Sequence, residues 1–164
     1  MNKIFVDLEM HPIPRSFKEE RQICTQEIIE IGAVKLNEQN KETDSFCEFV
    51  HPAYVQKIYA KFQKLTGITT EDVAEASVLA DVLTRFIDWC GEDYTIYSWS
   101  DSDIWQIMNE TRLKNLTDLP GLPYMYNNWR DFQQEFSELL HFEKVMNLGR
   151  AVNLAGLDFS GREH

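Results

Sequence analysis

The feature that most constrains this chain is a pair of carboxylates inside an apolar segment close to its start. Residues 5–10 read FVDLEM, which places Asp7 and Glu9 one residue apart in what is otherwise a buried strand. Alternate residues of a strand point to the same face, so the two carboxylates lie side by side. Carboxylates that close repel each other unless a cation separates them, and such oxygen ligands suit Mg²⁺ or Mn²⁺. The segment is therefore either a divalent-metal site or an edge strand with a solvated polar face.

The length and composition favour one globular domain without a membrane segment. The chain has 164 residues, of which 43% are hydrophobic, and this is enough for a substantial core. No apolar run approaches the roughly 20 residues that cross a bilayer, and we expect no signal peptide. Cys24, Cys47 and Cys90 are far apart and odd in number, which indicates free thiols and a cytoplasmic protein.

The charge balance restricts how the chain can meet nucleic acid. Its net charge of −11 argues against a protein that coats a polyanion, because that task needs a basic surface. An enzyme that holds one nucleic-acid end through bound metal ions is still compatible with this charge, since the ions dominate the local field.

The order of hydrophobic patterns predicts an α/β domain with a mixed sheet flanked by helices. Three strands come first, separated by short connections, which suggests an antiparallel start. Helices alternate with the remaining strands. We expect strands over residues 3–10, 27–37, 43–50 and 94–99, loops over 11–26 and 119–128 with a short strand at the end of the latter, and helices over 57–67, 69–76, 77–91, 103–114, 129–142 and 147–157.

Two further polar segments are candidates for a site. In YSWSDSDIWQI, residues 97–107, a strand ends and a helix begins, with Asp101 and Asp103 at the junction. Carboxylates there either cap the helix or contribute to a ligand site, because ligands gather at the carboxyl ends of strands in open α/β sheets. The last residues, GLDFSGREH, end on His164. That histidine is an ordinary surface residue unless the fold brings it to the carboxylates of the first strand.

Together, and in this order, the three segments resemble the motifs of the DnaQ-like 3′–5′ exonuclease superfamily, in the DEDD group that carries a histidine (DEDDh). FVDLEM is similar to the first motif, YSWSDSDIWQI to the second and GLDFSGREH to the start of the third. KLTGITTEDVAEA resembles the family's LTGIT segment, and EIIEIGAVKLN its second strand. The SW pair and the GR-H lead-in look most like the branch of the histone-mRNA 3′ exonuclease and the bacterial sporulation-inhibitor-like proteins. The resemblance covers nearly the whole chain and implies an RNase H-like fold.

The resemblance also implies a reaction, a cofactor and a partner. A metal-dependent 3′–5′ exonuclease with two Mg²⁺ or Mn²⁺ ions hydrolyses the terminal phosphodiester of RNA or single-stranded DNA and releases nucleoside 5′-monophosphates. Its partner is a single strand with a free 3′ end. By position, Asp7, Glu9 and Asp103 are the implied metal ligands and catalytic carboxylates, and His164 is the implied general base.

The choice between the two aspartates of the second motif rests on register. The family's aspartate lies four residues before an apolar helix position, and Asp103 has this relation to Ile107. Asp101 does not, so we interpret Asp101 as the helix cap.

Other residues carry weaker expectations. By resemblance, Leu65 and Thr66 in KLTGIT, together with Met10, lie beside the terminal nucleotide of the substrate. The alternative for KLTGIT is a plain helix stop followed by a cap. Aromatic side chains near the second motif either stack on bases or, as we expect, belong to the core or its margin; these are Tyr97, Trp99 and Trp105.

One departure from the family pattern leaves rival interpretations open. The family has a further aspartate shortly after the histidine, on a last helix, whereas this sequence stops at His164. We therefore expect residues 1–164 to form a single exonuclease-like domain truncated after the third-motif histidine, without the C-terminal helix, and weakly active at this length. The alternatives are a catalytically incomplete nucleic-acid-binding protein with the same fold and a metal-dependent hydrolase of small oligonucleotides.

Overall fold

The sheet that carries the two carboxylates has five strands of mixed direction. In the computed structural model, which describes residues 1–158, the strands lie in the order β3-β2-β1-β4-β5. β1, β2 and β3 are antiparallel neighbours, whereas β4 runs parallel to β1 and β5 parallel to β4. This confirms the predicted antiparallel start and the mixed sheet. The strands are β1 (Asn2–Pro12), β2 (Gln26–Leu36), β3 (Glu42–Phe49), β4 (Tyr94–Ser98) and β5 (Trp129–Asp131).

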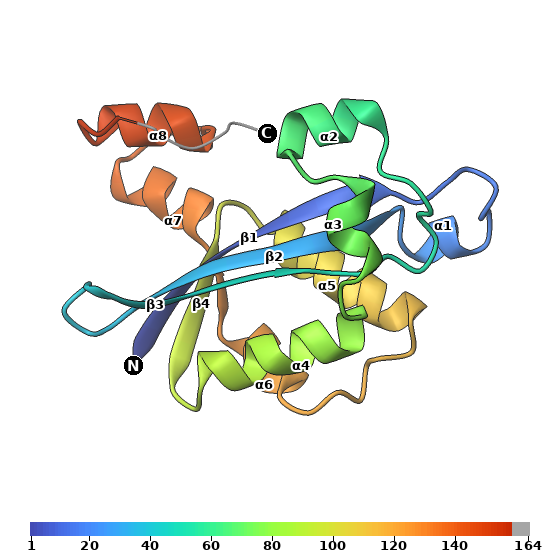
Figure 1. The fold of residues 1–164 in the computed structure, drawn as a ribbon. Coiled ribbons are helices and arrows are strands. Elements are labelled where there is room, and N and C mark those ends of the chain that lie inside the picture. Colours follow the sequence, from blue (N-terminus) through green and yellow to red (C-terminus); the bar gives the residue numbers. More distant parts are fainter. Residues whose placement is uncertain (159–164) are drawn as a thin grey trace.

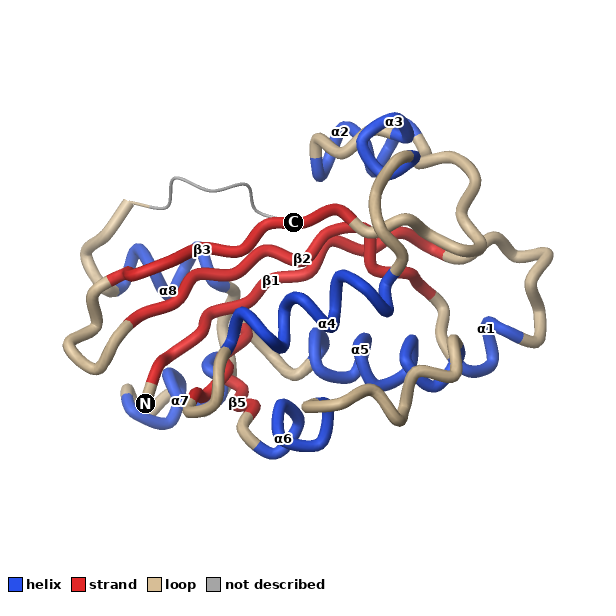
Figure 2. The backbone as a smooth tube through the Cα atoms, turned by 60° about the horizontal axis from the view of Figure 1, so that its bottom comes forward, coloured by secondary structure: helices blue, strands red, loops and turns tan. Residues whose placement is uncertain are grey.

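Helices lie on both sides of this sheet. In Figure 1, α4, α5 and α6 lie along one face, and α2, α7 and α8 lie beyond the other. Figure 2 shows α4, α5 and α6 in front of the sheet. None of the helices within residues 1–158 combines the length and the apolar character of a membrane span. The helices are α1 (Glu20–Ile23), α2 (Ala60–Thr66), α3 (Thr70–Ala74), α4 (Leu79–Cys90), α5 (Ser102–Leu113), α6 (Leu122–Asn127), α7 (Phe132–Leu139) and α8 (Leu148–Leu154).

Alternation along β1 separates the core from the carboxylates. Ile4, Val6 and Leu8 are buried in the main core, whereas Asp7 is exposed and Glu9 is half-buried. Fully burying one aliphatic side chain contributes roughly 1.5–3 kcal/mol, so these residues fix the orientation of the strand. α4 covers them with side chains at the predicted helical spacing: Leu79, Val82, Leu83, Phe86 and Cys90.

A second, smaller core joins β2 to the segments around α2 and α3. α2 ends as predicted at Gly67, whose φ of 80° is a left-handed C-cap. α3 begins with the predicted capping box, in which the Asp72 N–H donates to the Thr69 hydroxyl and the Thr69 N–H donates to the Asp72 carboxylate. The buried residues of this smaller core are Ile29, Val55, Ile58, Ile68 and Val73.

The expected loop over residues 119–128 is wrong in its second half, which forms α6. Gly121 occupies the N-cap with a φ of 85°, a conformation that favours glycine. Pro123 lies in the first turn of the helix, where no helical hydrogen bond needs its missing N–H. In this segment, the glycine and the proline therefore mark the start of a helix and not a loop.

Other boundaries also differ from the expected ones. The polar segment after the first motif contains α1, and β1 itself continues as far as Pro12. The short strand β5 takes the first residues of the helix expected at 129–142, so that α7 begins at Phe132. α2 begins at Ala60, three residues later than expected. These differences leave the order of the main elements unchanged.

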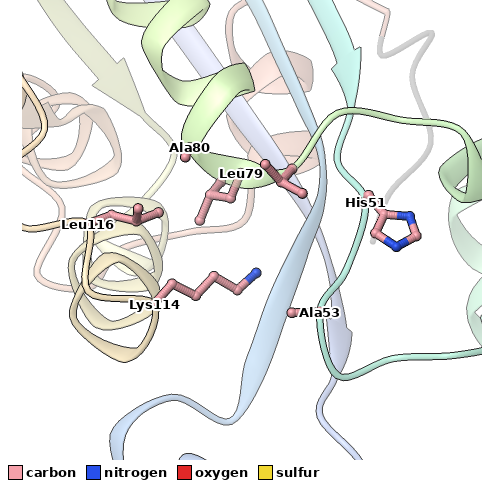
Figure 3. Close-up of a pocket in the computed structure, with 7 residues that line it drawn as sticks. His51, Ala53, Leu79, Ala80, Lys114 and Leu116 are labelled. Atoms are coloured by element: carbon pink, nitrogen blue, oxygen red, sulfur yellow. The ribbon is translucent and has the colours of Figure 1, made fainter.

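A buried ion network fixes α5 to the sheet. The Lys114 ammonium, at the end of α5, lies 2.8 Å from a Glu27 carboxylate oxygen and 2.7 Å from a Glu110 oxygen. Both glutamates are fully buried. Glu27 also accepts hydrogen bonds from the N–H groups of residues 53–55, and Glu110 accepts one from Ile28. Figure 3 shows the Lys114 side chain reaching toward the segment that carries Ala53. The network thus connects α5, β2 and the segment after β3.

Loss of the central cation should destabilise the whole fold. Burial lowers the pKa of Lys114, but the neighbouring carboxylates of Glu110 and Glu27 raise it by more, so the ammonium stays charged. Lys114→Met leaves two buried carboxylates without their cation, and we expect a loss of about 3–5 kcal/mol in the free energy of unfolding. Urea titration measures this loss. Lys41→Met, at an exposed turn residue, is the matched control; an equal and small change in both variants would contradict the prediction.

Candidate active site

The end of β4 opens one edge of β1. β4 pairs with β1 only as far as the pair Phe5 and Tyr97, and β4 ends at Ser98. Ser100 then takes a φ of 91°, and α5 starts at Ser102. The first turn of α5 therefore lies beside the middle of β1, where Asp7 is located.

Asp103 is a buried carboxylate that touches this open edge. It is only 5% exposed, and it accepts a hydrogen bond from the Leu8 N–H and further ones from its own N–H and from Ser102. Burial raises the pKa of Asp103 to about 7, and the nearby carboxylate of Asp7 adds to this effect. The structure thus brings Asp7 and Asp103 together, as the register argument predicted.

Glu9 shares a face of β1 with Asp7. We call the face that carries Phe5, Asp7, Glu9 and His11 the site face. Glu9 lies opposite Glu30 of β2, next to a register shift between Glu9 and Met10. Such irregularities are frequent beside active sites because they redirect side chains.

The donor set fits a divalent cation. Carboxylate oxygens are the ligands of hard cations such as Mg²⁺ and Mn²⁺. A cation near Asp7 and Asp103 would remove the repulsion that raises the pKa of Asp103. Within residues 1–158, no three histidine, cysteine, aspartate or glutamate side chains are grouped as a metal site. His164 lies outside the described residues, so its expected role as general base stays a prediction.

Asp101 occupies the N-cap position of α5, but its side chain makes no capping hydrogen bond. One carboxylate oxygen instead accepts a hydrogen bond from the Trp105 indole N–H, at 3.0 Å. The position of Asp101 matches the helix-cap interpretation, and the side chain serves to hold Trp105.

The expected substrate contacts lie in different surroundings. Leu65 is exposed near the end of α2, whereas Thr66 is half-buried and its hydroxyl donates to the Phe62 carbonyl. The Met10 side chain packs against the main core, on the face opposite Glu9. The substrate roles of these residues stay predictions.

The aromatic residues near the second motif divide into two groups. Tyr97 and Trp99 are half-buried and pack around Phe132, with ring centroids 5.8 and 5.9 Å from it. The two side chains are thus partly covered by α7, and whether they also stack on bases stays open. Trp105 is 54% exposed, so its expected place in the core or at its margin is wrong.

His11 is a residue of the site face that the sequence did not single out. It is fully buried, and its Nε2 accepts a hydrogen bond from the Tyr59 N–H at 3.0 Å. The Nδ1 atom lies 3.0 Å from the Pro12 carbonyl, to which it donates as the neutral tautomer. The ring also packs against Tyr59 and Phe62. His11 thus fixes the start of α2 to β1, two residues after Glu9.

Comparison with known proteins identifies the family. A family model described as an exonuclease, of the RNase T type, matches residues 4–164. The chain belongs to this exonuclease family. Its sequence is 29% identical to that of zebrafish (Danio rerio) ERI1 exoribonuclease 2. The alignment covers 88% of this chain and 29% of the length of that relative. The sequence is 26% identical to that of human (Homo sapiens) 3′-5′ exoribonuclease 1, over 84% of this chain and 41% of the relative. The chain thus spans less than half the length of these curated relatives.

Solved structures share the fold of this exonuclease-family chain. The nuclease domain of 3′hExo, a DEDDh family member bound to rAMP, aligns with 99% of this chain and 82% of its own length, at a TM-score of 0.76 and 21% identity. Cell-death related nuclease 4 aligns with 99% of this chain and 57% of its own, at a TM-score of 0.78 and 17% identity. Both the predicted family and the predicted RNase H-like fold are confirmed.

The carboxylate pair should give the metal-free chain a distinct pH dependence. The pKa of Asp103 rises on folding from an ordinary 3.8 to about 7, so its contribution to stability falls as pH rises through that window. Asparagine does not titrate, so Asp103→Asn does not lose stability in this way. Between about pH 4 and about pH 7, the free energy of unfolding of the variant should rise relative to that of the parent, by roughly 1.4 kcal/mol per pKa unit. Urea titrations across pH, with a chelator present, measure the difference. Added Mn²⁺ should stabilise the parent and not the variant; a difference that is constant with pH would contradict the prediction.

His11 should make α2 sensitive to acid. Burial lowers the pKa of His11 below its ordinary value of about 6.5. The neutral ring therefore stabilises the fold above about pH 6.5, and this stability is lost as the pH falls further. His11→Phe keeps a packed ring but leaves the Tyr59 N–H without its acceptor, which should cost about 1–3 kcal/mol near neutral pH and less in acid. His11→Gln is the matched variant, because its amide oxygen can accept the same hydrogen bond without titrating. Parallel pH dependence in all three chains would refute this role.

Proposed function

We propose that this chain is the nuclease domain of a metal-dependent 3′–5′ exonuclease that removes nucleoside 5′-monophosphates from a single strand. The electrostatic effect of Asp7 on the buried Asp103 carries the proposal, because two nearby carboxylates at the open edge of a strand need a cation to be charged together. Membership of the exonuclease family supports the same conclusion.

The residues that would hold metal are Asp7, Glu9 and Asp103. Two bound Mg²⁺ or Mn²⁺ ions supply an activated water and stabilise the leaving oxygen in this class of hydrolysis. The chain itself positions the carboxylates that would bind these ions. The Leu8 N–H and Ser102 orient the Asp103 carboxylate, and the main core holds β1 in place. We propose that Leu65 contacts the terminal nucleotide and that His164 takes the proton of the attacking water.

RNA is the first substrate to test. The curated relatives are named as exoribonucleases, and one structure with the same fold describes recognition of a histone mRNA stem-loop by a 3′-exonuclease. Another shows exonuclease I with a dT13 oligonucleotide, so single-stranded DNA is the second substrate. The three cysteines are free, which supports the cytoplasmic location that we propose.

The proposal predicts a ladder of products. A short 5′-labelled RNA strand incubated with the chain and Mn²⁺ should shorten stepwise, and a chelator should stop the reaction. Asp7→Asn keeps the size of the side chain but removes a metal-binding charge, so the rate should fall by more than roughly 100-fold, since groups that only orient metal ligands already contribute roughly 10- to 100-fold. Denaturing gel electrophoresis measures both rates.

Asp118→Asn, at an exposed carboxylate between α5 and α6, is the matched control and should cleave at the parent rate. Release of labelled mononucleotide as the first product would contradict the proposed polarity. Binding of the strand without shortening would favour the non-catalytic alternative.

A further inference from the structure

One segment of the chain is basic although the overall composition is acidic. With 27 acidic residues and 16 lysines and arginines, it has a net charge of −11. Residues 49–70 nevertheless contain no aspartate or glutamate, and this is the longest such stretch in the sequence. The same stretch carries Lys57, Lys61 and Lys64. Lys61 and Lys64 lie in α2, and Lys57 lies three residues before the helix.

The three lysines are exposed, and we call this group of residues the lysine face. Lys61 and Lys64 are three residues apart in α2, and this spacing places both side chains on the same side of a helix. Lys57 lies in the bend just before α2, and all three residues are exposed. None of them makes an ion pair within residues 1–158.

Several other basic side chains form ion pairs with carboxylates. Arg85 pairs with Glu48 at 2.6 Å, and Arg130 pairs with Glu135 at 3.1 Å. Lys114 is held in the buried network between two glutamates. Among residues 1–158, by contrast, the three lysines of the lysine face have no carboxylate partner, and their charges are available to an anionic partner.

The lysine face belongs to the element that is fixed beside the site. The Tyr59 N–H, at the N-cap of α2, donates to the Nε2 atom of His11. The rings of His11 and Phe62 lie 4.8 Å apart, so the first turn of α2 packs on the site face of β1. Figure 1 shows α2 above the sheet, on the side opposite α4 and α6.

We propose that the lysine face binds the phosphodiester backbone of the substrate strand, upstream of the nucleotide whose bond is cleaved. This inference rests on the proposed function, since it extends the path of the same strand away from Asp7 and Asp103. A strand of phosphates is repelled by the acidic surface that dominates the chain. α2, whose own sequence contains no acidic residue, offers less repulsion and supplies cations that pair with phosphates. It therefore sets the direction in which the strand leaves the site.

The test measures binding and its dependence on salt. The variant Lys57→Gln/Lys61→Gln/Lys64→Gln removes three charges at exposed positions. Both the parent and the variant carry Asp7→Asn, so that the labelled single-stranded RNA stays intact during fluorescence-anisotropy titration. Each phosphate contact on a single strand contributes roughly 0.7 to the slope of log affinity against log salt, so the slope should fall by about 2. Between about 50 and about 200 mM salt, the parent should therefore lose about 20-fold more affinity than the variant.

A matched control separates this face from a general charge effect. Lys3→Gln/Lys41→Gln/Arg112→Gln removes the same charge from the far end of β1, the turn between β2 and β3, and the last turn of α5. It should keep the parent slope, and a loss equal to that of the lysine-face variant would overturn the assignment.

The outcome also distinguishes this inference from the proposed function. With Asp7 restored, the lysine-face variant should show a higher KM on a long strand. Unchanged KM and an unchanged salt slope, with normal shortening of the strand, would refute the lysine face and leave the exonuclease function intact. Loss of the salt slope in a chain that shortens no strand would support the lysine face and refute the exonuclease function.

Discussion

The buried ammonium of Lys114 is the interaction on which the arrangement of the site depends. Its two carboxylate partners belong to elements that are far apart in the sequence: Glu27 lies in β2 and Glu110 in α5. Glu27 in turn binds the backbone of residues 53–55, which lead toward α2. One cation therefore ties the helix that begins beside Asp103 to the segment that leads to the lysine face. Ions of this kind are costly to bury, and every buried polar side-chain atom among residues 1–158 has a hydrogen-bond partner.

The candidate site differs from this network, because its charges have the same sign and repel each other. Backbone geometry places Asp103 within electrostatic reach of Asp7: the edge of β1 is open beyond Phe5, and the Leu8 N–H there needs an acceptor. The carboxylate satisfies that N–H and places a second acid beside the first. The structure therefore stabilises a position that is electrostatically unfavourable, and a raised pKa of this origin is typical of functional sites.

Local pattern predicted much of this arrangement. Alternation around FVDLEM assigned the two faces of β1. The spacing from Asp103 to Ile107 selected the aspartate that is buried and lies within electrostatic reach of Asp7, and its role in catalysis stays a prediction. The pairs that join distant segments carried no local signal. His11 meets Tyr59 across 48 positions of sequence, and a single histidine near a proline predicts a loop equally well. The sequence likewise does not predict the ion pair of Lys114 with Glu27, because each residue alone resembles an ordinary surface charge.

The acidic composition and the proposed anionic substrate are compatible once distance is considered. At physiological ionic strength, charges interact over about 8 Å, so carboxylates on the far faces of the sheet act weakly on a strand bound near α2. In the proposed complex, what counts is the charge within that distance: any ions that Asp7 and its neighbours would hold at one end, and the lysine face at the other. The net charge of −11 then opposes binding everywhere else on the surface. If both proposed contacts hold, attraction at two places and repulsion elsewhere would restrict a flexible strand to one path, which ends at the carboxylates of the candidate site.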